Sequence, residues 1–251
     1  MKKFLKILAV VVILVPLLGY GWLSYSAKQK LAAPADDALA ILVTDDAVRT
    51  EIDDWVVMRP ASGAPKAGMI LYPGAYCDVR GYSHVMKAVA AEGYLVVGVL
   101  MPFNMSIMAP DSADDVRAAF PQIERWVIAG HSLGGAMAGR YAFNHQDELA
   151  GLILWDSYPP DPNSLAESTL PVASILRAKP DGTISQIFED KRYLVPANSA
   201  RVAVPGGIHM NFGSFKSGTF EEEWDPSITM QAQHDIVTAA TLRALAEMTG
   251  S

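Results

Sequence analysis

The chain has 251 residues, a formal net charge of -7 at pH 7 and a single cysteine. Lys and Arg are scattered without a basic stripe, so we expect no nucleic-acid partner. The lone Cys77 excludes an intramolecular disulfide and offers no zinc-ligand cluster, so we expect a small buried hydrophobe there. No dinucleotide or P-loop glycine pattern follows a predicted strand, so we expect neither a cofactor nor a metal.

Residues 1–30 form a segment of their own. A basic opening with three lysines precedes an uncharged run from Ile7 to Leu23, which would be about 25 Å long as a helix. The lysines favour a cytoplasmic N-terminus. We therefore predict a retained single-pass anchor in the cell membrane, with the remaining chain outside the cytoplasm. The alternative is a cleaved signal peptide and a secreted protein, which a mature chain beginning near Ala27 would indicate.

Residues 31–40, with Pro34 and two acids, are predicted to be a linker, and 41–251 a single domain. Apolar and β-branched runs alternate with helix-compatible stretches along this domain. Such alternation predicts an α/β fold with a mostly parallel sheet covered by helices on both faces. Strands are expected at 48–52, 55–59, 66–72, 94–100, 126–129, 152–155, 172–178 and 199–205, and helices at 82–91, 111–124, 184–192 and 229–248.

Two loops after early strands are candidates for binding a substrate. The strand at 66–72 ends in Pro73-Gly74, and the backbone N–H of Ala75, or as second choice Tyr76, could stabilise an oxyanion. The loop after the strand at 94–100 contains Phe103 and Met105, which we interpret as an apolar substrate wall. Core packing explains these two side chains equally well.

Ser132 is the candidate nucleophile. It is the central residue of a G-x-S-x-G pattern, Gly130 to Gly134, that follows the strand at 126–129 and precedes a helix-compatible stretch. Glycines on both sides allow the tight strand-to-helix turn that exposes a serine hydroxyl. The same turn directs the N–H of Leu133 and the positive end of the helix toward a developing oxyanion.

A serine nucleophile needs a base, and the base needs a carboxylate to orient it. Among five histidines, His209 lies in a glycine-rich loop beyond a strand, at the sheet edge where open α/β folds keep their chemistry. Asp181, in the turn after the strand at 172–178, is the preferred acid, and Asp156, at the end of the strand at 152–155, is the alternative. The preferred order Ser132, Asp181, His209 is the one expected for this kind of triad.

The glycine-serine turn, the Asp181-Gly182 turn and the His209 loop together resemble the α/β-hydrolase superfamily over nearly the whole chain after residue 40. More narrowly, Tyr72-Pro73-Gly74, 155–159 and 209–213 resemble compact, often membrane-anchored bacterial members related to dienelactone hydrolases. Serine replaces the cysteine of those enzymes, which argues against a lactone substrate. Only about 17 residues separate the strands at 152–155 and 172–178, so no large cap domain is expected.

We therefore expect a carboxylesterase-like serine hydrolase that cleaves a small-molecule ester through an acyl-enzyme. An acyltransferase that uses the same triad is one alternative. A non-catalytic envelope protein on a hydrolase scaffold is the other. The residues do not indicate the oligomeric state.

Overall fold

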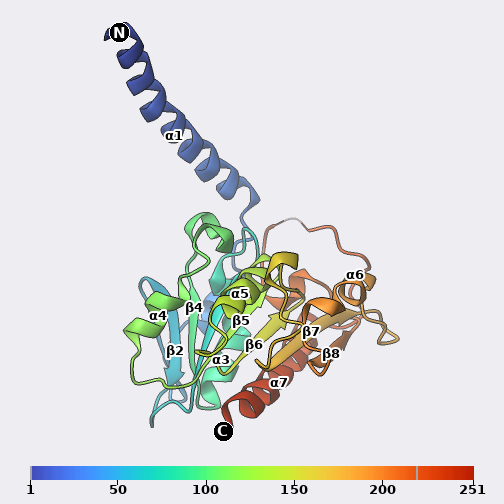
Figure 1. Cartoon of the computed structure of the whole chain (residues 1–251). Coiled ribbons are helices and arrows are strands. Elements are labelled where there is room, and N and C mark those ends of the chain that lie inside the picture. Colours follow the sequence, from blue (N-terminus) through green and yellow to red (C-terminus); the bar gives the residue numbers. More distant parts are fainter. Residues whose placement is uncertain (1, 219) are drawn as a thin grey trace.

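A computed structural model describes residues 2–218 and 220–251, with the side chains of residues 2–11 and 13 outside that description. Within the described chain, eight strands form one sheet of order β1-β2-β4-β3-β5-β6-β7-β8 (Figure 1). The run from β4 to β8 is parallel, whereas β1 and β2 are antiparallel at one edge. The strands are β1 (Val48–Ile52), β2 (Trp55–Pro60), β3 (Gly68–Tyr72), β4 (Leu95–Val99), β5 (Trp126–His131), β6 (Gly151–Trp155), β7 (Val172–Ala178) and β8 (Ala200–Pro205). This confirms the predicted α/β fold.

Helices cover both faces of the sheet. Side chains of α3 and α7 pack in one buried cluster, and side chains of α4 and α5 pack in a second cluster on the opposite face. The helices are α1 (Lys2–Lys30), α2 (Asp36–Ile41), α3 (Ser83–Ala91), α4 (Ala113–Ala119), α5 (Leu133–Asn144), α6 (Gln186–Asp190) and α7 (Met230–Thr249). The helix predicted at 111–124 is shorter than expected. It stops before Pro121, which disfavours helical backbone at the residue before it.

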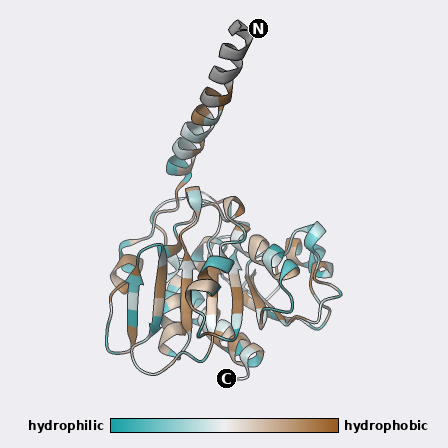
Figure 2. Ribbon diagram, turned by 60° about the vertical axis from the view of Figure 1, so that its left-hand side comes forward, coloured by the Kyte–Doolittle hydropathy of each residue, from teal (hydrophilic) through white to brown (hydrophobic). Residues whose placement is uncertain are grey.

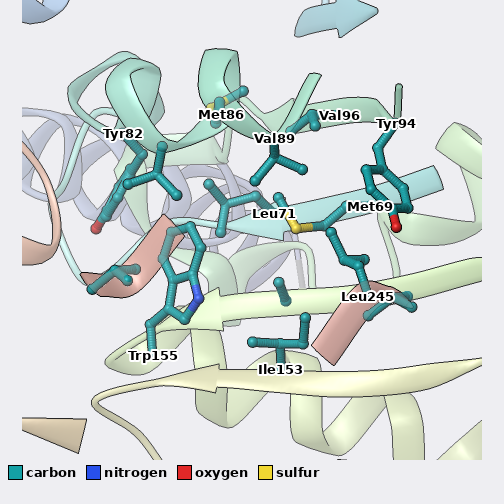
Figure 3. Close-up of a cluster of buried hydrophobic side chains, with 14 of the residues drawn as sticks. Met69, Leu71, Tyr82, Met86, Val89, Tyr94, Val96, Ile153, Trp155 and Leu245 are labelled. Carbon is teal, nitrogen blue, oxygen red and sulfur yellow. The ribbon is translucent and has the colours of Figure 1, made fainter. Parts of the chain in front are cut away.

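The central strands are apolar on both faces because both faces are covered. Every residue of β3, β4, β5 and β6 is buried, which accounts for their continuous rather than alternating hydrophobic sequence. Figure 3 shows one of the two clusters, with Met86 and Val89 of α3 lying over Leu71 and with Trp155 beside them. This packing buries the central strands, and the candidate site is built on the ends of β5 and β6.

Helix α1 extends away from the sheet and its covering helices (Figures 1 and 2). Toward its C-terminal end it contacts the body of the protein, where the Tyr20 ring meets Phe103 edge-on at 5.5 Å between centroids. Among the described residues, no helix combines the length and apolarity needed to cross a membrane. Part of the predicted anchor, the side chains of residues 2–11 and 13, lies outside the described residues. The anchor and the localisation therefore stay predictions.

The segment predicted as a linker packs against the domain. Residues 31–40 contain most of α2, and Ala38 is completely buried. The N–H of Ala32 donates to the carbonyl of Tyr76 at 2.9 Å, and the N–H of Ala35 donates to Ser214 at 3.0 Å. A linker would have a solvated backbone, so the structure corrects this expectation: the segment is part of the folded body.

Candidate active site

Ser132 stands at the turn between β5 and α5. Its backbone has φ 52° and ψ -124°, a conformation that costs a non-glycine residue on the order of 1–3 kcal/mol. The neighbouring glycines permit this turn through close approach. A Cβ on Gly130 would lie 2.4 Å from the backbone of Gly134, and a Cβ on Gly134 would lie 2.2 Å from the carbonyl oxygen of Tyr72. The predicted strand-turn-helix context of Ser132 is confirmed.

His209 is joined to Asp156, the alternative acid of the sequence analysis. Its Nδ1 donates to Oδ2 of Asp156 at 2.5 Å, and both side chains are buried. Asp156 directly follows β6, the neighbour of β5 in the sheet, and its backbone has φ 49°. Its second oxygen, Oδ1, accepts the backbone N–H of Arg177 at 2.8 Å. The carboxylate is therefore fixed at the strand ends, beside the turn that holds Ser132.

Asp181, the preferred acid of the sequence analysis, is not near His209 in this network. It is exposed, and its Oδ1 accepts the backbone N–H of Thr183 at 2.9 Å within its own turn. That bond holds the pKa of Asp181 below its ordinary value. The expectation that Asp181 orients His209 is therefore wrong. The predicted turn at Asp181 and Gly182 is present, but the Asp181 carboxylate bonds within that turn and not to His209.

Two hollows meet at Ser132 and His209. One, of about 300 Å³, is lined on its other sides by Gly74 to Cys77, His131 and Met210, with Lys30 at its edge. The second, of about 350 Å³, is lined mainly by Leu133, Ala136, Tyr158, Ile187 and Phe188. Phe220 lines both, and its ring stacks on the imidazole of His209 with 3.9 Å between centroids. A substrate whose carbonyl carbon lies at Ser132 could therefore place one substituent in each of the two hollows.

The loop after β3 leaves only one of its two candidate oxyanion donors, Ala75 and Tyr76, available to a substrate. The N–H of Tyr76 already donates to the carbonyl of Asn104 at 2.7 Å, so it is not available to a substrate oxygen in this conformation. Ala75 is exposed on the same loop and lines the hollow that contains Ser132. Leu133 is the first residue of α5, where backbone N–H groups lack intrahelical partners. Ala75 and Leu133 remain the candidate donors.

Phe103 and Met105, the predicted substrate wall, are placed elsewhere. Phe103 lines a third hollow, against Tyr20 and Ala27 of α1. Neither Phe103 nor Met105 is among the residues that line the two hollows at Ser132. The ring of Phe103 serves the contact with Tyr20 of α1. Tyr158, Ile187, Phe188 and Phe220 form the apolar walls instead. Ile187 and Phe188 lie in α6, within the helix predicted at 184–192, whereas Tyr158 and Phe220 lie in connections.

His131 and Cys77 lie close to the candidate site in buried, neutral surroundings. The imidazole of His131 stacks on Phe212 at 5.3 Å, and burial holds its pKa well below the ordinary 6.5. Cys77 is also buried, and burial raises the pKa of its thiol to about 11. A thiol with that pKa is a poor nucleophile at neutral pH. Among the described residues, no cluster of His, Cys, Asp and Glu is arranged to hold a metal ion.

The surroundings of Arg177 could not be predicted from the sequence. This buried residue of β7 bonds to Asp156 through its guanidinium and to Oε1 of Glu223 at 2.8 Å. Glu222 accepts the backbone N–H groups of His209 and Met210 at 2.9 and 2.8 Å. The acidic run 221–223 has the composition of solvated surface, but the carboxylates of Glu222 and Glu223 bond to His209 and Arg177. Its position shortly after the His209 loop was the available signal.

The sheet order, the turn at Ser132 and the Asp156–His209 pair define a hydrolase of the α/β class. The family model described as "Alpha/beta hydrolase family" matches residues 68–235. The chain belongs to this family.

Solved structures with the same fold include several hydrolases. A ferulic acid esterase from Streptomyces cinnamoneus has 16% identity and a TM-score of 0.54 over 75% of this chain and 68% of its own. A candidate dienelactone hydrolase from Klebsiella pneumoniae has 16% identity and a TM-score of 0.53 over 83% and 98%. A membrane phospholipase A described as a bacterial virulence factor has 14% identity and a TM-score of 0.53 over 97% and 99%. No curated protein matches the sequence. At these identities the likeness is one of fold.

Proposed function

We propose that the protein is a serine hydrolase that cleaves small carboxylic esters, with Ser132 as nucleophile, His209 as general base and Asp156 as the orienting acid. The observation that carries the proposal is the 2.5 Å bond from Nδ1 of His209 to Asp156, beside hollows that His209 shares with Ser132. The bond fixes the tautomer that leaves Nε2 unprotonated, as a base for the serine hydroxyl must be.

The reaction follows from this arrangement. His209 takes the proton of Ser132, and the serine oxygen attacks the ester carbonyl carbon. The N–H groups of Leu133 and Ala75 stabilise the negative oxygen of the tetrahedral intermediate. The C–O bond to the alcohol breaks, and His209 returns the proton to the leaving alcohol. Water then attacks the acyl-enzyme, again with His209 as base, and releases the acid.

The two hollows support an ester with substituents of moderate size on both sides of the carbonyl. The hollow of about 350 Å³ has apolar walls at Ile187 and Phe188, and it suits an aliphatic or aromatic group. The other hollow carries the oxyanion loop and has Lys30 at its edge. The esterase and phospholipase among the structural neighbours agree with ester chemistry at such a site.

Replacement of the nucleophile tests the proposal. We expect Ser132→Ala to lower kcat for p-nitrophenyl acetate by a factor on the order of a million, because both chemical steps pass through the serine oxygen. Ser199→Ala, a change of the same size at a residue that bonds to Pro196, should keep full activity. A fluorophosphonate should label the parent protein at Ser132 and leave the Ser132→Ala variant unlabelled. Full turnover in Ser132→Ala would falsify the assignment.

An added alcohol distinguishes hydrolysis from the acyltransferase alternative. The acyl-enzyme is common to both reactions, and only the acceptor differs. If water is the acceptor, increasing glycerol should leave free acid as the main product. A transesterified ester as the main product at low glycerol would favour the acyltransferase.

A further inference from the structure

The guanidinium of Arg177 lies at the centre of a charged cluster behind the proposed base. It bonds to the same oxygen of Asp156, Oδ2, that accepts the His209 hydrogen bond. Its Nη1 is 3.4 Å from Nδ1 of His209, and its Nη2 donates to Glu223. Only 5% of Arg177 is exposed, so solvent screens these interactions weakly. Burial alone would lower the pKa of Arg177, but Asp156 and Glu223 hold it above its ordinary value.

Aromatic rings and a second carboxylate fix the guanidinium in this place. It lies over the rings of Phe188, Phe220 and Trp224, at 5.2, 5.9 and 6.0 Å from their centroids. Glu223 is held in turn by the hydroxyl of Ser185, at 2.7 and 2.8 Å from its two oxygens. These contacts hold the Arg177 guanidinium in a single position, as a positioning group requires.

On the basis of this cluster and the proposed function, we infer that Arg177, held by Glu223, is a positioning residue that orients Asp156 toward His209 and sets the pH range in which His209 can act as a base. Arg177 also lines the hollow of about 350 Å³ beside Ser132, but the role inferred for it acts through Asp156. Its guanidinium and the imidazole of His209 bond to the same carboxylate oxygen of Asp156, so Arg177 fixes that oxygen in place.

The balance of charges gives the direction of the effect. His209 is faced by Asp156 after β6, by Arg177 from β7 and by Glu222 from the loop before α7. The neutral His131 from β5 lies 4.5 Å away between ring centroids, and Glu223 acts through its bond to Arg177. Lys30, at the end of α1, lines the same hollow. A cation near an imidazole disfavours its protonated form, and an anion favours it. Arg177 therefore opposes protonation of the base, and Glu223 weakens that opposition.

Two substitutions should shift the pH dependence of kcat/KM in opposite directions. The quantity to compare is the acid limb, the low-pH range in which kcat/KM falls as the base becomes protonated. Arg177→Met removes the positive charge and the N–H donors of the guanidinium. Because the protonated form of His209 is then less disfavoured, the acid limb should move to higher pH, on the order of one unit. Glu223→Gln keeps an acceptor for Arg177 but removes the anion, so the acid limb should move to lower pH. Arg177→Met should also lower kcat by on the order of 100-fold because Asp156 loses its support, with a smaller change in KM.

Controls separate positioning from simple stability. Arg177→Lys keeps the charge but not the fork, so it should restore the acid limb while kcat stays below that of the parent. Glu221→Gln removes the same charge from an exposed neighbour and should leave the profile in place. The measurements use the full chain with p-nitrophenyl acetate, and circular dichroism checks that each variant is folded. If Arg177→Met does not fold, the shift in Glu223→Gln carries the test.

The outcomes also distinguish this inference from the proposed function. An acid limb that does not move in Arg177→Met and Glu223→Gln, while Ser132→Ala is inactive, overturns the role of Arg177 and leaves the hydrolase intact. Shifts of opposite sign support it. A fully active Ser132→Ala removes the serine mechanism itself, whatever the two profiles show.

Discussion

At the scale of single residues, the backbone decides which carboxylate can serve His209. Asp156 has φ 49° directly after β6, and this conformation turns its side chain from the strand toward the loop that carries His209. Asp181 lies three residues beyond the end of β7, and its own turn uses its oxygen. Both positions look alike in the sequence, because each is an acid after an apolar strand.

Replacing each of the two aspartates by asparagine, one at a time, tests which of them supports His209. Asp156→Asn should lower kcat on the order of 10⁴-fold, because an amide does not hold the required tautomer of His209. Asp181→Asn should leave kcat unchanged, since its contact lies within an exposed turn. Steady-state kinetics with p-nitrophenyl acetate measures both. An active Asp156→Asn together with an inactive Asp181→Asn would restore Asp181 as the acid.

At the scale of elements, the turn between β5 and α5 depends on the contact of α5 with the end of β3. Gly134 meets the carbonyls of Tyr72 and Pro73 at distances that exclude a side chain. Backbone atoms on both sides cannot move without disturbing the sheet. The turn is thus formed by β3, β5 and α5, and the pattern G-x-S-x-G covers only the end of β5 and the start of α5.

An added methyl group at this joint should destabilise the protein. We expect Gly134→Ala to lower the free energy of unfolding by about 1–3 kcal/mol, because its Cβ would overlap backbone that is already packed. Gly21→Ala, in helix α1, has no atom within 4 Å of its new Cβ and gains helix propensity, so it should be near neutral. Urea unfolding measures both. Equal stability of the two variants would contradict the close contact at Gly134.

At the scale of the whole molecule, buried neutral histidines link stability to pH. Burial is the main cause that lowers the pKa of His131 and of His234, both from an ordinary value of 6.5. The unfolded chain therefore binds protons at these two residues at a higher pH than the folded chain does. Their contribution is fully present above pH 6.5 and is lost as the pH falls below that value.

Acidification should accordingly lower the melting temperature before the carboxylates titrate. We expect Tm to fall progressively from about pH 6.5 downward, with uptake of protons on unfolding. His234→Gln should reduce this pH dependence, because one of the two histidines is gone. Calorimetry across this range measures both quantities. A Tm that is constant down to pH 5 would contradict the buried neutral state.

The sequence by itself determined most of the elements and the two candidate site residues, Ser132 and His209, whose positions depend on local structure. Ser132 needs a strand, a turn and a helix that are contiguous in the chain, and His209 needs a loop after a strand. The turn at Ser132 and the loop at His209 are each formed by residues that are close in the sequence. Hydrophobic periodicity and the positions of the glycines therefore predict them.

Only the tertiary structure decided which acid bonds to His209, which backbone N–H stays available and which side chains line the candidate site. Asp156 reaches His209 across 53 positions of the chain, and Glu223 reaches Arg177 across 46. The N–H of Tyr76 is excluded as a donor by Asn104, in the loop after another strand. These choices depend on which strand ends lie side by side and on where loops turn back. Sheet order and side-chain packing set both, and no local pattern of residues encodes them.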